Sequence, residues 1–317
     1  MAEVSTSSTT GESPTSGRES VAVVVVTFNR ADLLCRMLAG LRALTGQPDA
    51  VIVVDNASTD HTREVLDAHR GLHLQRVHLD ENTGGAGGFR AGVQLAYDQG
   101  FDRIWLMDDD VVPAPDCLAI LMAQDEACLM SVREDTQGHL VEKAATDFDL
   151  SHPWAIRPKR GTVETTYGDR RAMPERVELH NIAFEGFLVR RDVVEAVGLP
   201  DESFFIFYDD VDFALRARRA GFRIWAVRDA VLVRQLDFSQ QHDLAGWKGY
   251  YMYRNLFAVH FRYGTNPLVR AKPYVIAAAV VAKSPFHGGK AEAGNVIRAI
   301  RAARGMRSIP GSTPPPR

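Results

Sequence analysis

Apolar residues in the first 110 positions form short continuous runs that alternate with helically spaced segments. The continuous runs, rich in β-branched residues, are typical of strands buried on both faces of a sheet, and they cover residues 21–27, 50–55, 72–79 and 103–107. Between them the spacing predicts helices, with bounds near 34–44, from 58–60 onward, and 84–97. This alternation predicts an α/β fold with a mostly parallel central sheet flanked by helices.

The pattern changes in the second part of the chain. Residues 128–177 are rich in charge and irregular, and we expect loops, short helices and an insertion there. Order returns after residue 186, and Phe213, Ala214 and Ala217 line one side of a helix that begins near Asp210.

The composition is that of a soluble globular protein, with a net charge of −3, 45% apolar residues and 24% charged residues. The three cysteines show no zinc-like or disulfide-like spacing, which favours a reducing cytoplasm. Residues 1–20 are rich in Ser, Thr and Gly and lack an apolar segment, so we expect a disordered tail rather than a signal peptide. The longest apolar run, Tyr274–Ala282, is far shorter than the roughly 20 residues of a membrane span, and no transmembrane helix is expected.

Polar residues follow several predicted strands directly. Asp55, Asn82 and the run Asp108 to Asp110 all lie at or just beyond strand ends. In parallel sheets, ligands bind at the carboxyl ends of the strands, so we expect these side chains to converge on one edge.

The three consecutive aspartates predict a cation. In an extended segment Asp108 and Asp110 point the same way and Asp109 the opposite way. Two carboxylates on one side suit a hard divalent cation, Mg²⁺ or Mn²⁺, which offsets their repulsion and can bind a diphosphate. A solvated acidic turn is the alternative, and the buried strand before the cluster favours the metal.

A glycine-rich segment and a pair of aspartates are two further candidate motifs. Residues 82–92, "NTGGAGGFRAG", do not follow the first strand as a dinucleotide loop would, and their glycines are expected to allow close helix–sheet packing. Asp209 and Asp210 stand at a predicted helix start, where they either cap the helix or supply a general base. No GxSxG or HExxH motif is present.

Six segments, taken together, resemble glycosyltransferase family 2 over roughly residues 21–262. They are "VVVVTFNRADLL", "VIVVDNASTDHT", "NTGGAGGFRAG", "WLMDDDVVP", the stretch from "GFLVRRDVVEAVG" to "FYDDVDFALRARRAG", and "YYMYRN". The "GGAGGF" variant is most similar to bacterial galactofuranosyltransferases and rhamnosyltransferases of cell-wall and polysaccharide assembly. The resemblance implies a GT-A fold and the transfer of a sugar, with inversion, from a nucleoside diphosphate sugar. The nucleotide of this donor would be UDP or dTDP.

The resemblance also implies a division of the chain. Residues 21–127 would form the nucleotide-sugar-binding half, and residues 128–261 the acceptor and catalytic half. Residues 262–317 would be a basic helical extension with a disordered end.

The resemblance assigns roles to individual residues. Thr27, Asn29 and Arg30 would lie beside the nucleotide, Asp55 would face its base, and Asn82 would help hold the donor. Asp108 and Asp110 match the Asp-x-Asp pair, with Asp110 the stronger candidate metal ligand. Asp210 matches the catalytic base and Asp209 is its neighbour.

The sequence departs from the family at one position. Relatives commonly carry a histidine metal ligand in the strand after the base helix, but here Arg234 or Gln235 occupies the region, and the nearest histidine is His242. Either His242 replaces that ligand, or the metal is held more weakly. An arginine at this place could then take over part of the charge neutralisation.

The sequence supports other functions less well than sugar transfer. A nucleotidyltransferase would need a Gly-rich basic loop near the first strand, which the sequence lacks, and a degenerate nucleotide-sugar-binding module is supported by the missing histidine alone. Nucleic-acid binding is not expected, because the edge is acidic and no aromatic-basic motif is present.

The C-terminal region is strongly basic. Residues 262–317 contain ten Lys and Arg residues against one acidic residue, Glu292. Four arginines recur at helical spacing beside an apolar face with Val296, Ile297 and Ile300, and they are Arg298, Arg301, Arg304 and Arg307. We expect a peripheral contact with an anionic membrane at the inner face of the plasma membrane, where the resembling enzymes use glycan or polyprenyl-linked acceptors. A helix packed on the core with solvated arginines is the alternative.

Overall fold

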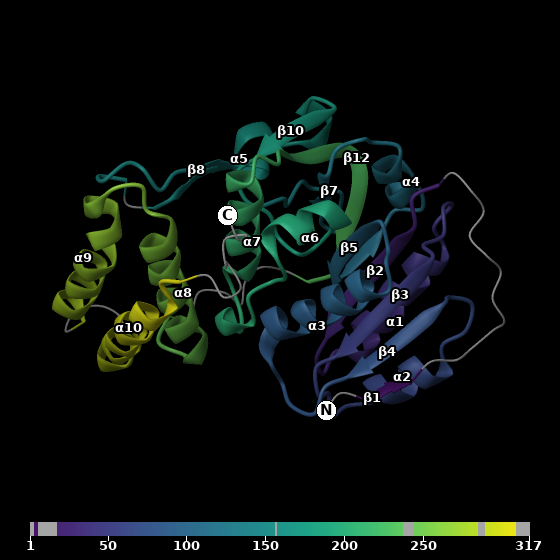
Figure 1. Cartoon of the computed structure of the whole chain (residues 1–317), viewed down its shortest axis with the longest axis horizontal. Coiled ribbons are helices and arrows are strands. Elements are labelled where there is room, and N and C mark those ends of the chain that lie inside the picture. Colours follow the sequence, from purple (N-terminus) through teal and green to yellow (C-terminus); the bar gives the residue numbers. More distant parts are fainter. Residues whose placement is uncertain (1–2, 6–17, 156, 237–243, 285–288, 309–317) are drawn as a thin grey trace, which may run out of the picture.

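A computed structural model describes residues 3–5, 18–155, 157–236, 244–284 and 289–308. Within these residues one ten-stranded mixed sheet runs through both halves of the chain, in the order β1-β4-β3-β2-β5-β11-β7-β12-β10, with β6 paired to β12. Helices cover its faces, and three C-terminal helices form a lobe at one end of the molecule (Figure 1).

The first half has the predicted parallel arrangement. Strands β2 (Val21–Thr27), β3 (Ala50–Asp55), β4 (Leu74–His78) and β5 (Arg103–Asp108) are mutually parallel. They are connected by α1 (Ala31–Arg42), α2 (Thr62–Ala68) and α3 (Gly84–Asp98). Every residue of β2 and β3 is buried, which explains why these runs lack polar alternation.

The second half makes the sheet mixed. Strand β11 (Phe187–Arg190) is antiparallel to both β5 and β7 (Cys128–Glu134), whereas β12 (Ile224–Arg234) is parallel to β7. Strands β6 (Val111–Pro113) and β10 (Arg176–Leu179) pair antiparallel with β12. The expectation of irregular structure from residue 128 was therefore wrong for β7, which is a buried central strand.

Shorter elements complete this half. They are α4 (Cys117–Met122), the pair β8 (Ala145–Phe148) and β9 (Lys159–Thr162), α5 (Val163–Tyr167), η1 (Arg170–Ala172), α6 (Arg191–Val197), η2 (Glu202–Phe204) and α7 (Asp209–Arg219). The β8–β9 pair extends from the sheet towards the C-terminal lobe (Figure 1).

The C-terminal lobe consists of α8 (Trp247–Tyr263), α9 (Pro267–Lys283), α10 (Gly289–Ala303) and η4 (Arg304–Met306). Most of the apolar side of α10 packs inward, because Val296 and Ala299 are fully buried and Ile300 contacts the same core cluster, whereas Ile297 is 38% exposed. For most of this side the structure therefore shows the alternative, a helix packed on the core.

Part of the N-terminal segment is ordered. Residues Glu3–Ser5 form strand β1, antiparallel to β4 at the edge of the sheet. The expectation of a fully disordered tail over residues 1–20 is therefore wrong for this strand. Its backbone N–H and C=O groups pair with the open edge of the sheet at β4, which the sequence pattern does not reveal.

Glycines bring α3 close to the sheet, as expected from the sequence. A Cβ on Gly88 would lie 2.5 Å from Val26 Cγ1, and a Cβ on Gly92 would lie 2.3 Å from Val24 Cγ1. Because real Cβ atoms do not approach other atoms so closely, the helix can sit at this depth only with glycine at both positions.

Replacing Gly92 with alanine is expected to destabilise the protein by about 1–3 kcal/mol, because overpacking outweighs the better helix propensity of alanine. Gly85→Ala is the matched control in the same helix, since nothing lies within 4 Å of a Cβ there. Chemical denaturation of both variants tests this. Equal stabilities for Gly92→Ala and the wild type would show that the helix can move away from the sheet at no cost.

Candidate active site

The ends of the parallel strands bring the predicted polar residues to one edge. Thr27 stands opposite Asp55, Asp55 stands opposite His78, and Val26 stands opposite Asp108 in the strand registers. The convergence predicted from strand ends is therefore confirmed, and it follows from the parallel register alone.

Two of the predicted nucleotide-side residues, Asn29 and Asp55, hold neighbouring loops together. The Asn29 Oδ1 accepts the backbone N–H of Thr59 at 2.7 Å, and Asp55 Oδ1 accepts that of Ser58 at 2.9 Å. Asp55 Oδ2 also lies 3.1 Å from His78 Nδ1. These contacts fix the loops after β2 and β3 beside each other, so the edge has a defined shape.

Asn82 lies in the loop that leads into α3. Its Oδ1 accepts hydrogen bonds from Asn56 Nδ2 at 3.1 Å and from the Gly84 backbone N–H at 2.8 Å. Asn56 Nδ2 also donates to the Gly84 carbonyl at 2.9 Å. The start of α3 is therefore tied to the end of β3.

Asp109 does not point away from the other predicted site residues. Strand β5 ends at Asp108 and β6 begins at Val111, so Asp109 and Asp110 form a turn rather than continuing an extended strand. Asp109 is buried, and it accepts hydrogen bonds from Thr27 Oγ1 at 2.8 Å and Arg30 Nη1 at 3.0 Å. The expectation from strand alternation was wrong here, and Asp109 anchors the β2–α1 loop.

Asp110 is buried but incompletely neutralised. Its Oδ2 lies 3.7 Å from both Arg30 Nη1 and Arg234 Nη2, whereas its Oδ1 has no hydrogen-bond partner among the described residues. Burial and the nearby Glu185 carboxylate raise the pKa of Asp110 to about 6. Burial, Glu185 and Asp110 also raise the pKa of Asp108 well above its usual range.

Glu185 is a central residue that sequence reasoning missed. It forms ion pairs with Arg133 and, at 3.4 Å, with Arg234 Nη1. Burial alone would raise the pKa of Glu185, yet the two arginines hold it below its usual range. The available signal was a lone acidic residue before Gly186 and an apolar strand, which is too weak to stand out without the fold.

The carboxylates at this edge fit a divalent cation in the chemistry of their donors. The buried Oδ1 of Asp110, which has no hydrogen-bond partner within the described part of the chain, is an available oxygen ligand. Burial, followed by the neighbouring carboxylates, raises the pKa values of Asp108 and Asp110. Within the described ranges no cluster of three or more His, Cys, Asp or Glu side chains suits a metal. The predicted third ligand, His242, lies outside the described residues.

Asp209 and Asp210 begin α7 but differ in their surroundings. Asp209 is buried, and burial together with the Asp210 charge raises its pKa well above the usual range. The Asp210 Oδ1 accepts the Val211 backbone N–H at 2.7 Å. Burial raises the pKa of Asp210 to about 6, although that N–H and the charge of Lys159 oppose the shift. The Glu185 charge also contributes to this increase, as it does for Asp108 and Asp110.

The segment before α7 has an unusual backbone. Phe205, Phe207 and Tyr208 have φ angles of 62°, 67° and 68°, which L-residues with large side chains rarely adopt. Asn255 of α8 stabilises it by donating to the carbonyls of Ile206 and Phe207, both at 2.8 Å. Asn255, the last residue of the "YYMYRN" motif, is thus a positioning residue for the start of α7.

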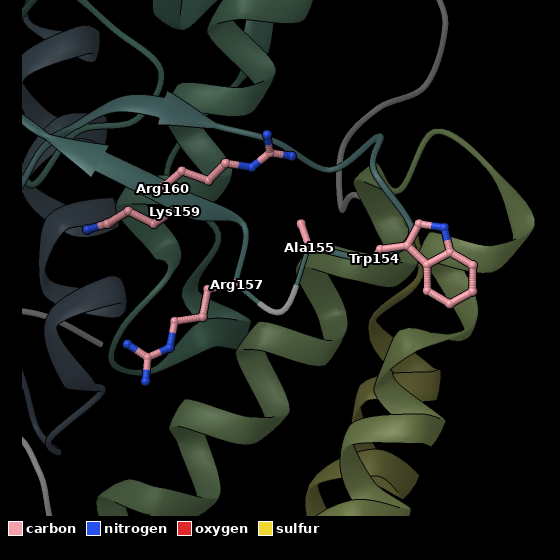
Figure 2. A pocket seen from close by; sticks show the side chains of 5 residues that line it. All are labelled: Trp154, Ala155, Arg157, Lys159 and Arg160. Atoms are coloured by element: carbon pink, nitrogen blue, oxygen red, sulfur yellow. The ribbon is translucent and has the colours of Figure 1, made fainter.

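A pocket of about 660 Å³ is lined by Trp154, Ala155, Arg157, Lys159 and Arg160, which lie in β9 and in the segment before it. In Figure 2, Arg157 and Lys159 extend to the opposite side from Trp154, which points towards the C-terminal helices. Lys159, which lines this pocket, also lowers the pKa of Asp210 through its positive charge.

Comparison with known proteins agrees with this geometry. The family model of Glycosyl transferase family 2 matches residues 22–198. The galactofuranosyltransferase GlfT1 of Mycobacterium tuberculosis is 34% identical over 67% of this chain and 69% of its own length. The dTDP-rhamnosyl transferase RfbF of Shigella flexneri is 25% identical over 68% of this chain and 69% of its own length.

Solved structures share the fold. A mannosyltransferase from Pyrobaculum calidifontis, determined with GDP-mannose and Mn²⁺, covers 93% of this chain and 78% of its own with a TM-score of 0.54 and 22% identity. A GalNAc-T7 structure with UDP, GalNAc and Mn²⁺ covers 92% of this chain and 55% of its own with a TM-score of 0.58 and 14% identity. The family model spans more than half of the chain and the architecture agrees, and the chain therefore belongs to glycosyl transferase family 2 as a glycosyltransferase with the GT-A fold.

Proposed function

We propose that the protein transfers galactofuranose, with inversion, from a uridine diphosphate donor to a glycan. The observation that carries this proposal is the single buried charge cluster, in which Glu185 acts on both Asp110 at the strand edge and Asp210 at the start of α7. The similarity to GlfT1 supports galactofuranose. The similarity to RfbF keeps rhamnose from a dTDP-linked donor as the second candidate. A product assay with both donors, analysed by mass spectrometry, decides between them.

The donor is proposed to lie along the edge formed by β2, β3 and β5. Asp55 would face the nucleotide base, and Thr27, Asn29 and Arg30 would border the nucleotide beside Asn82. Asp108 and Asp110 would hold Mg²⁺ or Mn²⁺, which when bound neutralises the diphosphate leaving group. Arg234, 3.7 Å from Asp110, supplies positive charge at the same place.

Asp210 is proposed as the general base, with Asp209 beside it. Its carboxylate would accept the proton of an acceptor hydroxyl while the hydroxyl oxygen forms the new bond to the anomeric carbon. The bond from that carbon to the diphosphate oxygen breaks in the same step, and the electron pair leaves with the nucleoside diphosphate. A single displacement of this kind inverts the anomeric configuration.

The acceptor is proposed to be a glycan or polyprenyl-linked glycan of cell-wall or polysaccharide assembly. It would approach from the pocket with Trp154, Arg157 and Lys159, where the positive charge of Lys159 acts on Asp210. We place the reaction on the cytoplasmic side, in peripheral contact with the inner face of the plasma membrane.

Two other functions are less well supported. Family membership disfavours a nucleotidyltransferase. A binding module without turnover has no use for Asp210, a carboxyl whose pKa of about 6 is suited to proton uptake near neutral pH. Donor turnover in the presence of an acceptor, compared with donor binding alone, separates an enzyme from a binding module.

Asp210→Asn is expected to lower kcat by roughly 10²-fold or more, because the amide cannot take up a proton. Donor affinity, measured by calorimetry, should remain nearly unchanged. Asp209→Asn provides the matched control, with a smaller loss of kcat expected. Turnover at the wild-type rate in Asp210→Asn would refute the assignment of the base.

The pH dependence follows from the raised pKa of Asp210. Below about pH 6 the carboxyl is protonated in the folded protein and cannot act as a base, so kcat should fall about tenfold per pH unit as the pH decreases. Measuring kcat at saturating donor between pH 5 and 8 separates this effect from the titration of Asp110. A kcat that stays constant down to pH 5 would contradict the prediction.

Asp110→Ala and Asp109→Ala should have different effects. Asp110→Ala removes a proposed metal ligand and should weaken binding of the nucleoside diphosphate in Mn²⁺ by about tenfold or more. Asp109→Ala removes the partner of Thr27 and Arg30 and should mainly lower stability, by about 2 kcal/mol. Calorimetry and denaturation of both variants test this separation. Equal losses of affinity, or full wild-type activity in excess chelator, would favour neutralisation by Arg234 over a metal.

A further inference from the structure

The outward side of α9 is apolar along its length. One exposed stripe recurs at intervals of three or four residues, namely Leu268, Ala271, Val275, Ala278 and Ala282. Leu268 is 64% exposed and Val275 is 67% exposed, whereas Val269 and Pro273 face inward and are buried. Helices on the surface of water-soluble domains normally turn polar residues outward, so this stripe is a candidate contact surface.

Trp154 lies beside this stripe, at 83% exposure. Lys272 of α9 holds the segment that carries Trp154. The Lys272 Nζ donates hydrogen bonds to the carbonyls of His152 at 2.6 Å and Ala155 at 2.8 Å. Asn266 also donates to the Ser151 carbonyl at 2.7 Å. In Figure 2 the Trp154 ring extends next to the C-terminal helices. An exposed tryptophan held in place on an apolar surface is typical of membrane interfaces.

Positive charge surrounds the α9 stripe. Lys283 ends the helix itself and is exposed. On the other flank, Arg304 lies over the Tyr274 ring at 5.2 Å, and Arg307 Nη2 donates to the Tyr274 hydroxyl at 3.3 Å. Residues 262–317 contain one acidic residue, Glu292, against ten Lys and Arg residues. The apolar stripe with its flanking cations therefore suits a partner that has an apolar interior and an anionic surface.

We propose that the α9 stripe and Trp154 form a docking surface for an anionic lipid bilayer. Helix α9 would lie in the plane of the interface, with its apolar stripe in the acyl boundary and its flanking cations among the headgroups. None of the helices within the described ranges is long and apolar enough to cross a bilayer. This proposal rests on the membrane contact of the proposed function and adds its location. It assigns the contact to α9, whereas the sequence pattern pointed to the arginines of α10.

A second copy of the chain fits this surface less well. Pairing the α9 stripes of two copies would bring their flanking Lys and Arg residues together. Each copy has only one acidic residue between positions 262 and 317 to offset this positive charge. Repulsion of like charges disfavours that contact, whereas anionic lipid neutralises the same rim.

The test is co-sedimentation of the full chain with vesicles of phosphatidylglycerol or of phosphatidylcholine, without donor. Binding to the anionic vesicles is expected, and it should decrease with added salt. Ala278→Glu should weaken it by about tenfold or more, because a carboxylate would face the acyl boundary. Ala39→Glu is the matched control, since it places the same charge on an exposed position of α1 and should bind like the wild type.

Leu268→Gln combined with Val275→Gln removes apolar surface without changing the charge, and it should also lower binding about tenfold. Both side chains are largely exposed, so thermal melting should be unchanged. Equal binding to neutral vesicles, or unchanged binding of Ala278→Glu, would overturn the proposal. So would a dimer in sedimentation velocity that Ala278→Glu dissociates, because the stripe would then serve self-association.

Sugar transfer to a short water-soluble acceptor is measured on the same variants. Lost vesicle binding with retained transfer supports a docking role for the α9 stripe. If the wild type binds vesicles but transfers no sugar, the proposed function fails while the docking surface stands.

Discussion

Repulsion between buried carboxylates is the constraint on which the site depends. Three consecutive aspartates at and after the end of β5 meet Glu185 from the segment just before β11, in a region from which much of the water is excluded. Such a group is tolerated only if positive charge reaches it. That charge comes from arginines far apart in sequence, namely Arg30 after β2, Arg133 of β7 and Arg234 at the end of β12.

The neutralisation is uneven, and this has a chemical consequence. Asp109 is fully satisfied by Thr27 and Arg30, and Glu185 by Arg133 and Arg234, whereas Asp110 retains a buried oxygen without a partner among the described residues. Burial, and after it the nearby Glu185 charge, raises the pKa of Asp110 to about 6. An incoming cation gains most at this residue, which agrees with the proposed position of the donor diphosphate.

The sequence predicted those parts of the molecule that depend on local pattern. Continuous apolar runs identified β2 and β3, and polar residues at strand ends identified the edge with Asp55 and Asp108. It did not reveal Glu185 or Arg133, because their importance comes from antiparallel pairing between strands more than 50 residues apart. The direction of Asp109 was also missed, since a two-residue turn interrupts the alternation on which that expectation relied.

The C-terminal lobe holds the helix that carries the proposed base. Helix α8 supplies Asn255, which holds the strained backbone before Asp209. It also supplies Arg262 and Tyr263, whose side chains both donate to Asp212 Oδ1, at 2.8 Å and 2.6 Å. Asp212 lies one turn into α7 and is fully buried, so these bonds fix the helix that carries Asp210. A boundary at residue 262 therefore divides α8 at the point where it holds the base helix, and the lobe that carries α9 also sets the position of the proposed base.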